Sequence, residues 1–230
     1  RSVGRPPGEI EVAFEGFSPD SFHFYSELEQ NNTKVWWEAN KTRYETHVRK
    51  PLTELLEQLA PEFGSGKVYR PYRDTRFSLD KTPYKDRAAA ALFGAGATGL
   101  YIEVSARGLD LGGGYWMPGK DQLDKFRDLI NDPRYFGDLE AEVETQAEAG
   151  FQLYQGDALK TAPRGFTEDH PRIHLLRLKH MVQEKQQVPA EWMYTAAAAD
   201  RIATEWRVVT EWNQWLLDNV GPSSLAPRPR

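Results

Sequence analysis

The segment Ala88–Trp116, AAAALFGAGATGLYIEVSARGLDLGGGYW, decides the fold. Its apolar and β-branched residues gather at 88–93, 99–105 and 108–116, and glycine-bearing stretches separate these three runs. Tyr101-Ile102-Glu103-Val104 is rich in residues that favour strands, and Ala106-Arg107-Gly108 suits a tight hairpin connection. We therefore expect an antiparallel β meander in the middle of the chain.

Helical patterns lie on both sides of this meander. Ser18 followed by Pro19 is typical of a helix start, because a hydroxyl caps free N–H groups and proline fits the first helical position. Thr33 can cap a second helix, and Pro51 predicts a kink or break of that helical run near Lys50. After the meander we expect a short helix at 169–179, a return strand at 180–188 and a long helical region from Pro189.

This order of elements predicts an α+β protein, with a central antiparallel meander flanked by N-terminal and C-terminal helices. We expect one domain over residues 14–220. The Pro- and Gly-rich residues 1–13 are expected to form a flexible arm, and residues 221–230 a disordered tail.

The composition excludes several classes of protein. The 230 residues contain no cysteine, which rules out disulfides, thiolate zinc sites and cysteine nucleophiles. The longest apolar run, Ala88–Phe93, is too short to span a bilayer, and residues 1–11 lack the apolar core of a signal peptide. A net charge of −5 argues against general polyanion binding. We expect a cytoplasmic protein without a membrane partner, and the sequence indicates no cofactor.

Two glycine motifs and one histidine pair favour ordinary structural interpretations. The sequence Gly94-Ala-Gly-Ala-Thr-Gly99 has the spacing of a dinucleotide-binding turn, but a strand pattern follows it where a helix is needed. Gly64-Ser-Gly-Lys67 lacks the first glycine and the hydroxyl of a phosphate loop. His170 and His174 have the spacing of two ligands on one helix face, yet no third ligand stands out, so they are weak metal candidates.

The strongest functional signal is the segment Lys67–Arg87, KVYRPYRDTRFSLDKTPYKDR. It holds seven basic and three acidic residues, a local net charge of +4 in a chain whose total is −5. Such a basic island can focus potential onto an anionic ligand, and arginine binds carboxylate or phosphate with two parallel hydrogen bonds. The candidate ligand-binding residues of this segment are Arg70, Arg73, Arg76, Lys81 and Lys85.

Three residues between these cations are candidates for acid–base work: Asp74, Asp80 and Tyr84. We expect a strand at 68–77, which would place Arg70, Asp74 and Arg76 on one face. Lys160 and Arg164, in the irregular stretch 156–172, could complete the anion site. Equally, the arginines and aspartates could form an internal ion-pair network that only holds the meander to the helices.

At these residues the sequence resembles the family known as domain of unknown function 2461. The family pattern R-x-x-R-D-x-R-F-x-x-D-K-x-P-Y-K is matched here over Arg70–Lys85. The resemblance covers nearly the whole chain and includes Phe14-Glu-Gly-Phe-Ser-Pro19, Gly112-Gly-Gly114 and Asp169-His-Pro171. It implies a soluble bacterial protein, and it assigns no reaction, cofactor or catalytic residue.

Three functions remain open at this stage. The favoured one is a small-molecule site, binding or catalytic, for a phosphate- or carboxylate-bearing ligand on the Arg70–Lys85 motif. The first alternative is a scaffold that binds a protein partner and uses the motif as a structural network. The second alternative is single-stranded nucleic-acid binding, which the net charge of −5 disfavours. The sequence nominates no nucleophile–base pair, so whether the protein is an enzyme stays open.

Overall fold

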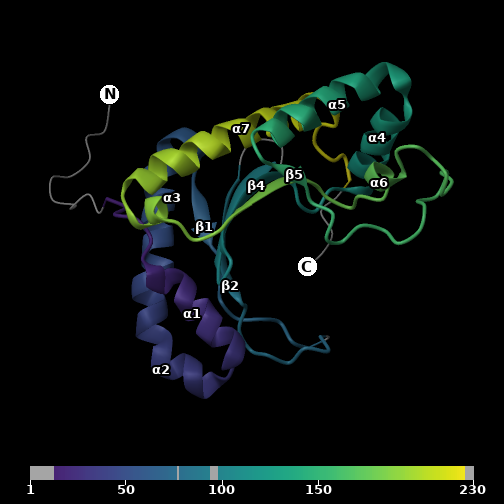
Figure 1. Ribbon diagram of the computed structural model, residues 1–230. Coiled ribbons are helices and arrows are strands. Elements are labelled where there is room, and N and C mark those ends of the chain that lie inside the picture. The colour runs from purple at the N-terminus through teal and green to yellow at the C-terminus, as the bar shows by residue number, and fades with distance from the viewer. Residues whose placement is uncertain (1–12, 77, 94–97, 226–230) are drawn as a thin grey trace.

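The computed structural model describes residues 13–76, 78–93 and 98–225, which form a six-stranded antiparallel sheet with helices packed on it (Figure 1). The strands are β1 (Gly66–Val68), β2 (Arg87–Phe93), β3 (Gly99–Ser105), β4 (Gly108–Tyr115), β5 (Gln152–Leu153) and β6 (Met181–Gln187). Their order in the sheet is β1-β2-β3-β4-β6-β5. The predicted α+β class is confirmed, and the meander 88–116 occupies the centre of the sheet.

The helices gather at two ends of the sheet and along one of its faces. They are α1 (Pro19–Gln30), α2 (Lys34–Tyr44), α3 (Lys50–Phe63), α4 (Lys120–Asn131), α5 (Pro133–Glu148), α6 (Ile173–Leu176) and α7 (Ala197–Asn219). Figure 1 shows α1–α3 at the β1 and β2 end, α4–α6 near β5, and α7 running along the sheet between them. The glycine fingerprint at 94–99 lies largely outside the described residues.

The core lies between the sheet and helices α1, α3 and α7. Ile102 and Val104 of β3 are fully buried there with Trp206 and Val209 of α7. The indole N–H of Trp206 donates to the carbonyl of Tyr101 at 3.2 Å, so α7 is tied to the sheet by hydrogen bonding as well as by apolar contact. Among the described residues, no helix is both long enough and apolar enough to cross a membrane.

Two expected elements are shorter in the structure than the sequence indicates. The strand expected at 68–77 ends at Val68, and the described residues of 69–86 form a loop in which an isolated bridge joins Tyr72 and Tyr84. One further backbone bond joins Tyr69 to Ala89 of β2 at 2.8 Å. Beyond it the segment pairs with itself, since the N–H of Arg73 donates to the carbonyl of Pro83 and that of Lys85 to the carbonyl of Pro71. The helix expected at 169–179 is only the single turn of α6. Position 77 lies outside the described residues.

The disruption expected near Lys50 is a π-helical turn, η1 (Glu45–Arg49), which joins α2 directly to α3. Pro51 lacks an N–H, so the carbonyl of His47, four residues earlier, loses its usual helical partner. The hydroxyl of Ser21 in α1 donates to that carbonyl at 2.5 Å, and Ser21 is fully buried. A side chain from α1 thus satisfies the backbone group that the proline leaves without a donor.

The chain after α7 folds back onto α4. The hydroxyls of Ser223 and Ser224 both hydrogen-bond to the carboxylate of Asp121, the first at 2.7 Å and the second at 3.0 Å. These contacts lower the pKa of Asp121 to about 2, with the bond from Ser223 as the largest cause. Residues 221–225 of the expected tail are therefore attached to the first turn of α4.

Replacement of Ser21 by alanine is expected to lower the free energy of unfolding by about 1–3 kcal/mol, because the buried carbonyl of His47 is left without a donor. Urea unfolding followed by circular dichroism measures the change. Ser26→Ala, the same substitution on the same helix, is the control, since Ser26 is only partly buried. Equal stability of the two variants would contradict the assignment.

Candidate functional site

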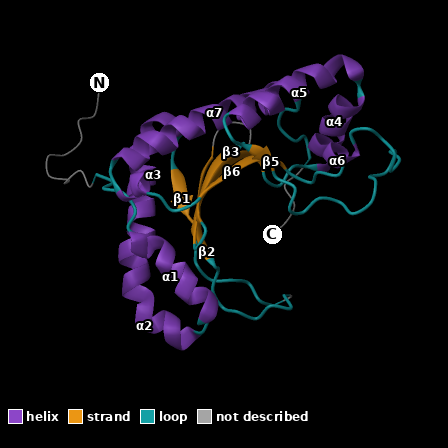
Figure 2. Ribbon diagram, viewed as in Figure 1, coloured by secondary structure: helices purple, strands orange, loops and turns teal. Residues whose placement is uncertain are grey.

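The sheet has one face that the helices do not use for the core, and we call it the open face. Alternation along β3 places Ile102 and Val104 in the core and Tyr101 and Glu103 on the other side. The strand register places Asp110 of β4 opposite Glu103, and Gly112 opposite Tyr101. Figure 2 shows α7 on one side of the sheet and the loop before β2 extending away from it on the other.

Glu103 stands at the centre of the open face. Its Oε2 accepts a hydrogen bond from the hydroxyl of Tyr101 and forms an ion pair with Nε of Arg87 at 3.0 Å. Only 6% of Glu103 is exposed. Burial raises the pKa of Glu103 and the nearby Asp110 adds to that rise, while Tyr101 and Arg87 act in the opposite direction. Burial and the charge of Glu103 raise the pKa of Tyr101 well above its ordinary value, so this hydroxyl stays protonated and acts as a hydrogen-bond donor to Glu103.

Asp110 and Glu184 join Glu103 to form what we call the carboxylate cluster. Glu184 of β6 lies opposite Gly112, so the cluster occupies three neighbouring strands. Burial raises the pKa of Asp110 and of Glu184, and the charges of Asp110 and Glu103 raise that of Glu184 further. Oδ2 of Asp110 is buried without a hydrogen bond, with Nη2 of Arg107 3.7 Å away. Among the described residues, no group of three such side chains could hold a metal ion.

An aromatic cluster borders the carboxylates: Tyr101, Trp116, Tyr154 and His180. The ring of Trp116 is nearly parallel to that of Tyr101, with centroids 6.4 Å apart, and lies 4.8 Å from the ring of His180. Nδ1 of His180 donates to the carbonyl of Trp116, which fixes the orientation of both residues. Trp116 nevertheless stays 51% exposed, so one part of an ordered aromatic ring faces solvent.

A cation cluster of Arg70, Lys85 and Arg87 lies at the other border of the carboxylates. Burial lowers the pKa of Lys85, and the like charges of Arg70 and Arg87 lower it further. Within the described part of the chain, neither the Arg70 guanidinium nor the Lys85 ammonium has a hydrogen bond or ion pair. Lys85 therefore lies beside two like charges, while Arg87 pairs with Glu103 and Asp86. The charge of Arg70 also acts on Asp74, whose pKa it helps to lower.

The motif loop, by which we mean the described residues of 69–86, is firmly attached at its base. The side chain of Asn32 bonds to both the N–H and the carbonyl of Tyr84, at 3.1 and 2.9 Å. The ring of Tyr84 stacks on Trp37 with centroids 4.1 Å apart, and Tyr84 is only 3% exposed. Tyr84, a candidate for acid–base work, thus lies in the core beneath the loop.

The other charged residues of the motif pair with one another in the outer part of the loop. Nη1 of Arg73 contacts Asp80 and donates to Thr82 at 2.7 Å, while Arg76 bonds to Asp74 through Nε and Nη2. The hydrogen bond from the Arg76 side chain is the main cause that lowers the pKa of Asp74 to about 2. Nζ of Lys81 donates to the carbonyl of Thr75 at 2.9 Å. The predicted site residues of the motif thus fall into two groups, an internally paired tip and the cations at the base.

Lys160 and Arg164 lie in a different part of the molecule from these pairs. Arg164 lines a hollow of about 710 Å³ together with Lys120 and Arg127 of α4. Lys160 is exposed on the same long loop.

The two histidines singled out as weak metal candidates have separate surroundings. Nε2 of His170 bonds to Asn131 at 3.2 Å, and its Nδ1 accepts from the backbone N–H of Arg172. His174 is exposed and lines a second hollow of about 600 Å³ beside β5.

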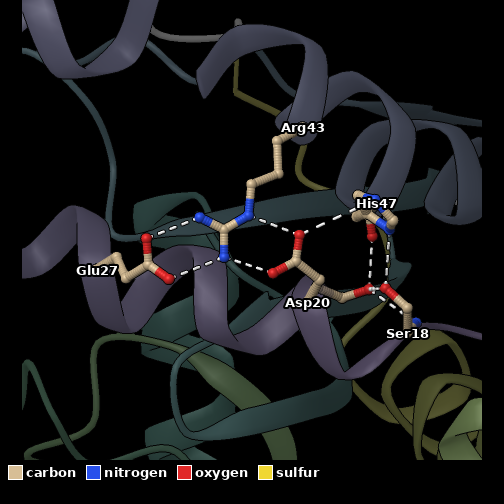
Figure 3. Close-up of polar contacts among 6 residues, drawn as sticks. Ser18, Asp20, Glu27, Arg43 and His47 are labelled. Atoms are coloured by element: carbon tan, nitrogen blue, oxygen red, sulfur yellow. Dashed lines mark hydrogen bonds and ion pairs between the residues drawn. The ribbon is translucent and has the colours of Figure 1, made fainter. Parts of the chain in front are cut away.

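A further polar cluster connects α1 with α2 and η1 (Figure 3). Arg43 bonds to both Asp20 and Glu27, and Oγ of Ser18 lies 3.1 Å from Nδ1 of His47. Ser18, His47 and Asp20 are the residue types of a hydrolase triad. However, Asp20 is held by Arg43 in two bonds, and its Oδ2 is 3.9 Å from Nε2 of His47. The cluster therefore joins helices, and Ser18 serves as the N-cap of α1.

Sequence reasoning placed the functional residues in the motif and did not single out Tyr101, Glu103, Asp110 or Glu184. A signal for the first two was present, because polar residues alternate with the apolar Ile102 and Val104 in a strand pattern. Glu184 gave no such signal. It reaches the site only because β6 pairs with β4 across about seventy residues of sequence.

The fold and this face define an α+β protein with a polar, partly buried sheet surface bordered by the motif loop. The sequence model of the DUF2461 family, whose members are described as conserved hypothetical proteins, matches residues 20–215 of this chain. The chain therefore belongs to the DUF2461 family. A search of curated proteins and a search of solved structures each gave no match.

Replacement of Glu184 by glutamine is expected to raise the melting temperature at pH 7.5. A carboxyl whose pKa is higher in the folded than in the unfolded state costs stability as the pH rises above its unfolded pKa. The gain should therefore shrink as the pH falls toward 4. Thermal unfolding across this pH range measures it, with the exposed Glu140→Gln of α5 as the charge-matched control. A gain that is independent of pH would refute the assigned repulsion.

Proposed function

We propose that the open face binds a small molecule through a phosphate or carboxylate group, which the cation cluster of Arg70, Lys85 and Arg87 holds. The observation that carries the proposal is the half-buried Lys85, whose pKa is lowered by burial and by its two cationic neighbours. Burying part of a lysine beside two other cations costs free energy, and a bound anion would recover it. Arginine supplies the planar donors that match both anion classes.

The anion is proposed to bind at the base of the motif loop and not at its tip. Arg73 and Arg76 already bond to Asp80 and Asp74, so their charges are compensated within the loop. Arg70 and Lys85 have no such partner among the described residues. The charge of Glu103, a member of the carboxylate cluster, also acts on Lys85, so the cation and carboxylate clusters adjoin.

Titration with inorganic phosphate by calorimetry is the direct test. Arg70→Ala and Lys85→Ala are each expected to weaken phosphate binding by about tenfold or more, because a hydrogen bond to a charged group contributes about 1.5–3 kcal/mol. Lys160→Ala is the matched control, since Lys160 is an exposed lysine on another loop. Full retention of affinity in both cluster variants would contradict the proposal.

A structural role for the tip of the motif loop is the second candidate, and the internal pairing of Arg73 and Arg76 favours it for those two residues. Both members of the Arg76–Asp74 pair are exposed, and exposed pairs contribute about 0–1 kcal/mol. Arg76→Ala is therefore expected to fold normally and to lose at most about 1 kcal/mol of stability. Unfolding of this variant in a thermal melt would instead assign the loop tip a major structural role.

A further inference from the structure

We propose that the ligand is a nucleoside phosphate, whose base stacks on Trp116 while its phosphate is held by the cation cluster. The inference rests on the proposed function and adds the class of ligand. It depends on a different part of the open face, the aromatic cluster, and can fail while anion binding itself holds.

Trp116 has the properties of a stacking platform. The residue is 51% exposed, yet its ring is held by the nearly parallel rings of His180 and Tyr101 and by the tilted ring of Tyr154. His180 also donates a hydrogen bond to the carbonyl of Trp116. An ordered, exposed ring costs little conformational entropy when a flat ligand adds to the stack. Every nucleobase has a flat π surface that can stack on such a ring.

A continuous chain of contacts leads from Trp116 to the cation cluster. Trp116 stacks on Tyr101, the Tyr101 hydroxyl donates to Glu103, and Glu103 pairs with Arg87 at 3.0 Å. The aromatic ring and the anion-binding guanidinium are thus separated by two side chains on one surface. A molecule that reaches both must carry a ring at one end and an anionic group at the other.

The carboxylate cluster lies between these two ends and calls for hydrogen-bond donors. Oδ2 of Asp110 is buried and has an ion pair with Arg107 at 3.7 Å but no hydrogen bond, and the pKa of Glu184 is raised by burial and by its acidic neighbours. Between Tyr101 and Glu184 the sheet presents only Gly112, which leaves no side chain above the backbone there. The hydroxyl groups of a ribose would donate to these carboxylates, since an ionised carboxylate only accepts.

The test is a calorimetric comparison of four probes with the full chain: adenosine 5′-monophosphate, adenosine, ribose 5-phosphate and inorganic phosphate. The nucleotide is expected to bind at least about fivefold more tightly than phosphate, the low end of what base stacking on an aromatic side chain contributes. Trp116→Ala should reduce the nucleotide to the affinity of ribose 5-phosphate and leave inorganic phosphate unchanged. Trp116→Phe should restore most of the loss, because a ring remains.

Met117→Ala is the matched control, since Met117 is the neighbouring residue and is 78% exposed. Equal affinity of nucleotide and phosphate, or an unchanged nucleotide affinity in Trp116→Ala, would overturn the inference while leaving anion binding intact. Equal affinity of the nucleotide and ribose 5-phosphate would also overturn the inference, because the base would then contribute nothing to binding. Failure of all the phosphate-bearing probes would overturn the proposed function as well.

Discussion

The alternation of side chains along β3 is the constraint on which the rest of the structure depends. One side of this strand carries Ile102 and Val104 into the core beneath α7, and the other carries Tyr101 and Glu103 onto the open face. A shift of the register by one residue would exchange these sides, burying two polar groups and exposing two apolar ones. The same hydrogen-bonded ladder thus fixes both the core and the polar surface.

On the open face, burial disfavours the charged forms of several ionisable side chains. Burial raises the pKa values of Glu103, Asp110 and Glu184, and neighbouring carboxylates add to the rise for Glu103 and Glu184. Burial likewise lowers the pKa of Lys85, because it disfavours the charged form of a cation. Apolar side chains at these positions would avoid the cost of removing charges from water. Perturbed ionisable groups that gather on one surface are typical of functional sites, and this cost is the physical reason for placing one here.

Most of the fold could be predicted from the sequence because the patterns that mark its helices and strands are local. The hydroxyl caps Ser18 and Thr33 and the helix disruption before Pro51 act within a few residues, and the structure has helices beginning at Pro19 and Lys34 and a π turn at Glu45–Arg49. The prediction of a strand at 68–77 was wrong. Alternating basic and acidic residues occur both in strands and in loops whose charged side chains pair with one another, so the sequence does not distinguish the two. The backbone bonds between Arg73 and Pro83 and between Lys85 and Pro71 show that the segment pairs with itself.

The sequence by itself determined the class of fold, the meander at 88–116 and the basic motif, since period, turn residues and charge are written along the chain. Only the tertiary structure decided which motif residues are free to act. Arg73 and Arg76 are neutralised by Asp80 and Asp74, whereas Arg70 and Lys85 come to lie beside Arg87 and Glu103. The pairing of β6 with β4 then brought Glu184 to the same face. Such long-range proximity depends on the packing of the sheet, and no local pattern records it.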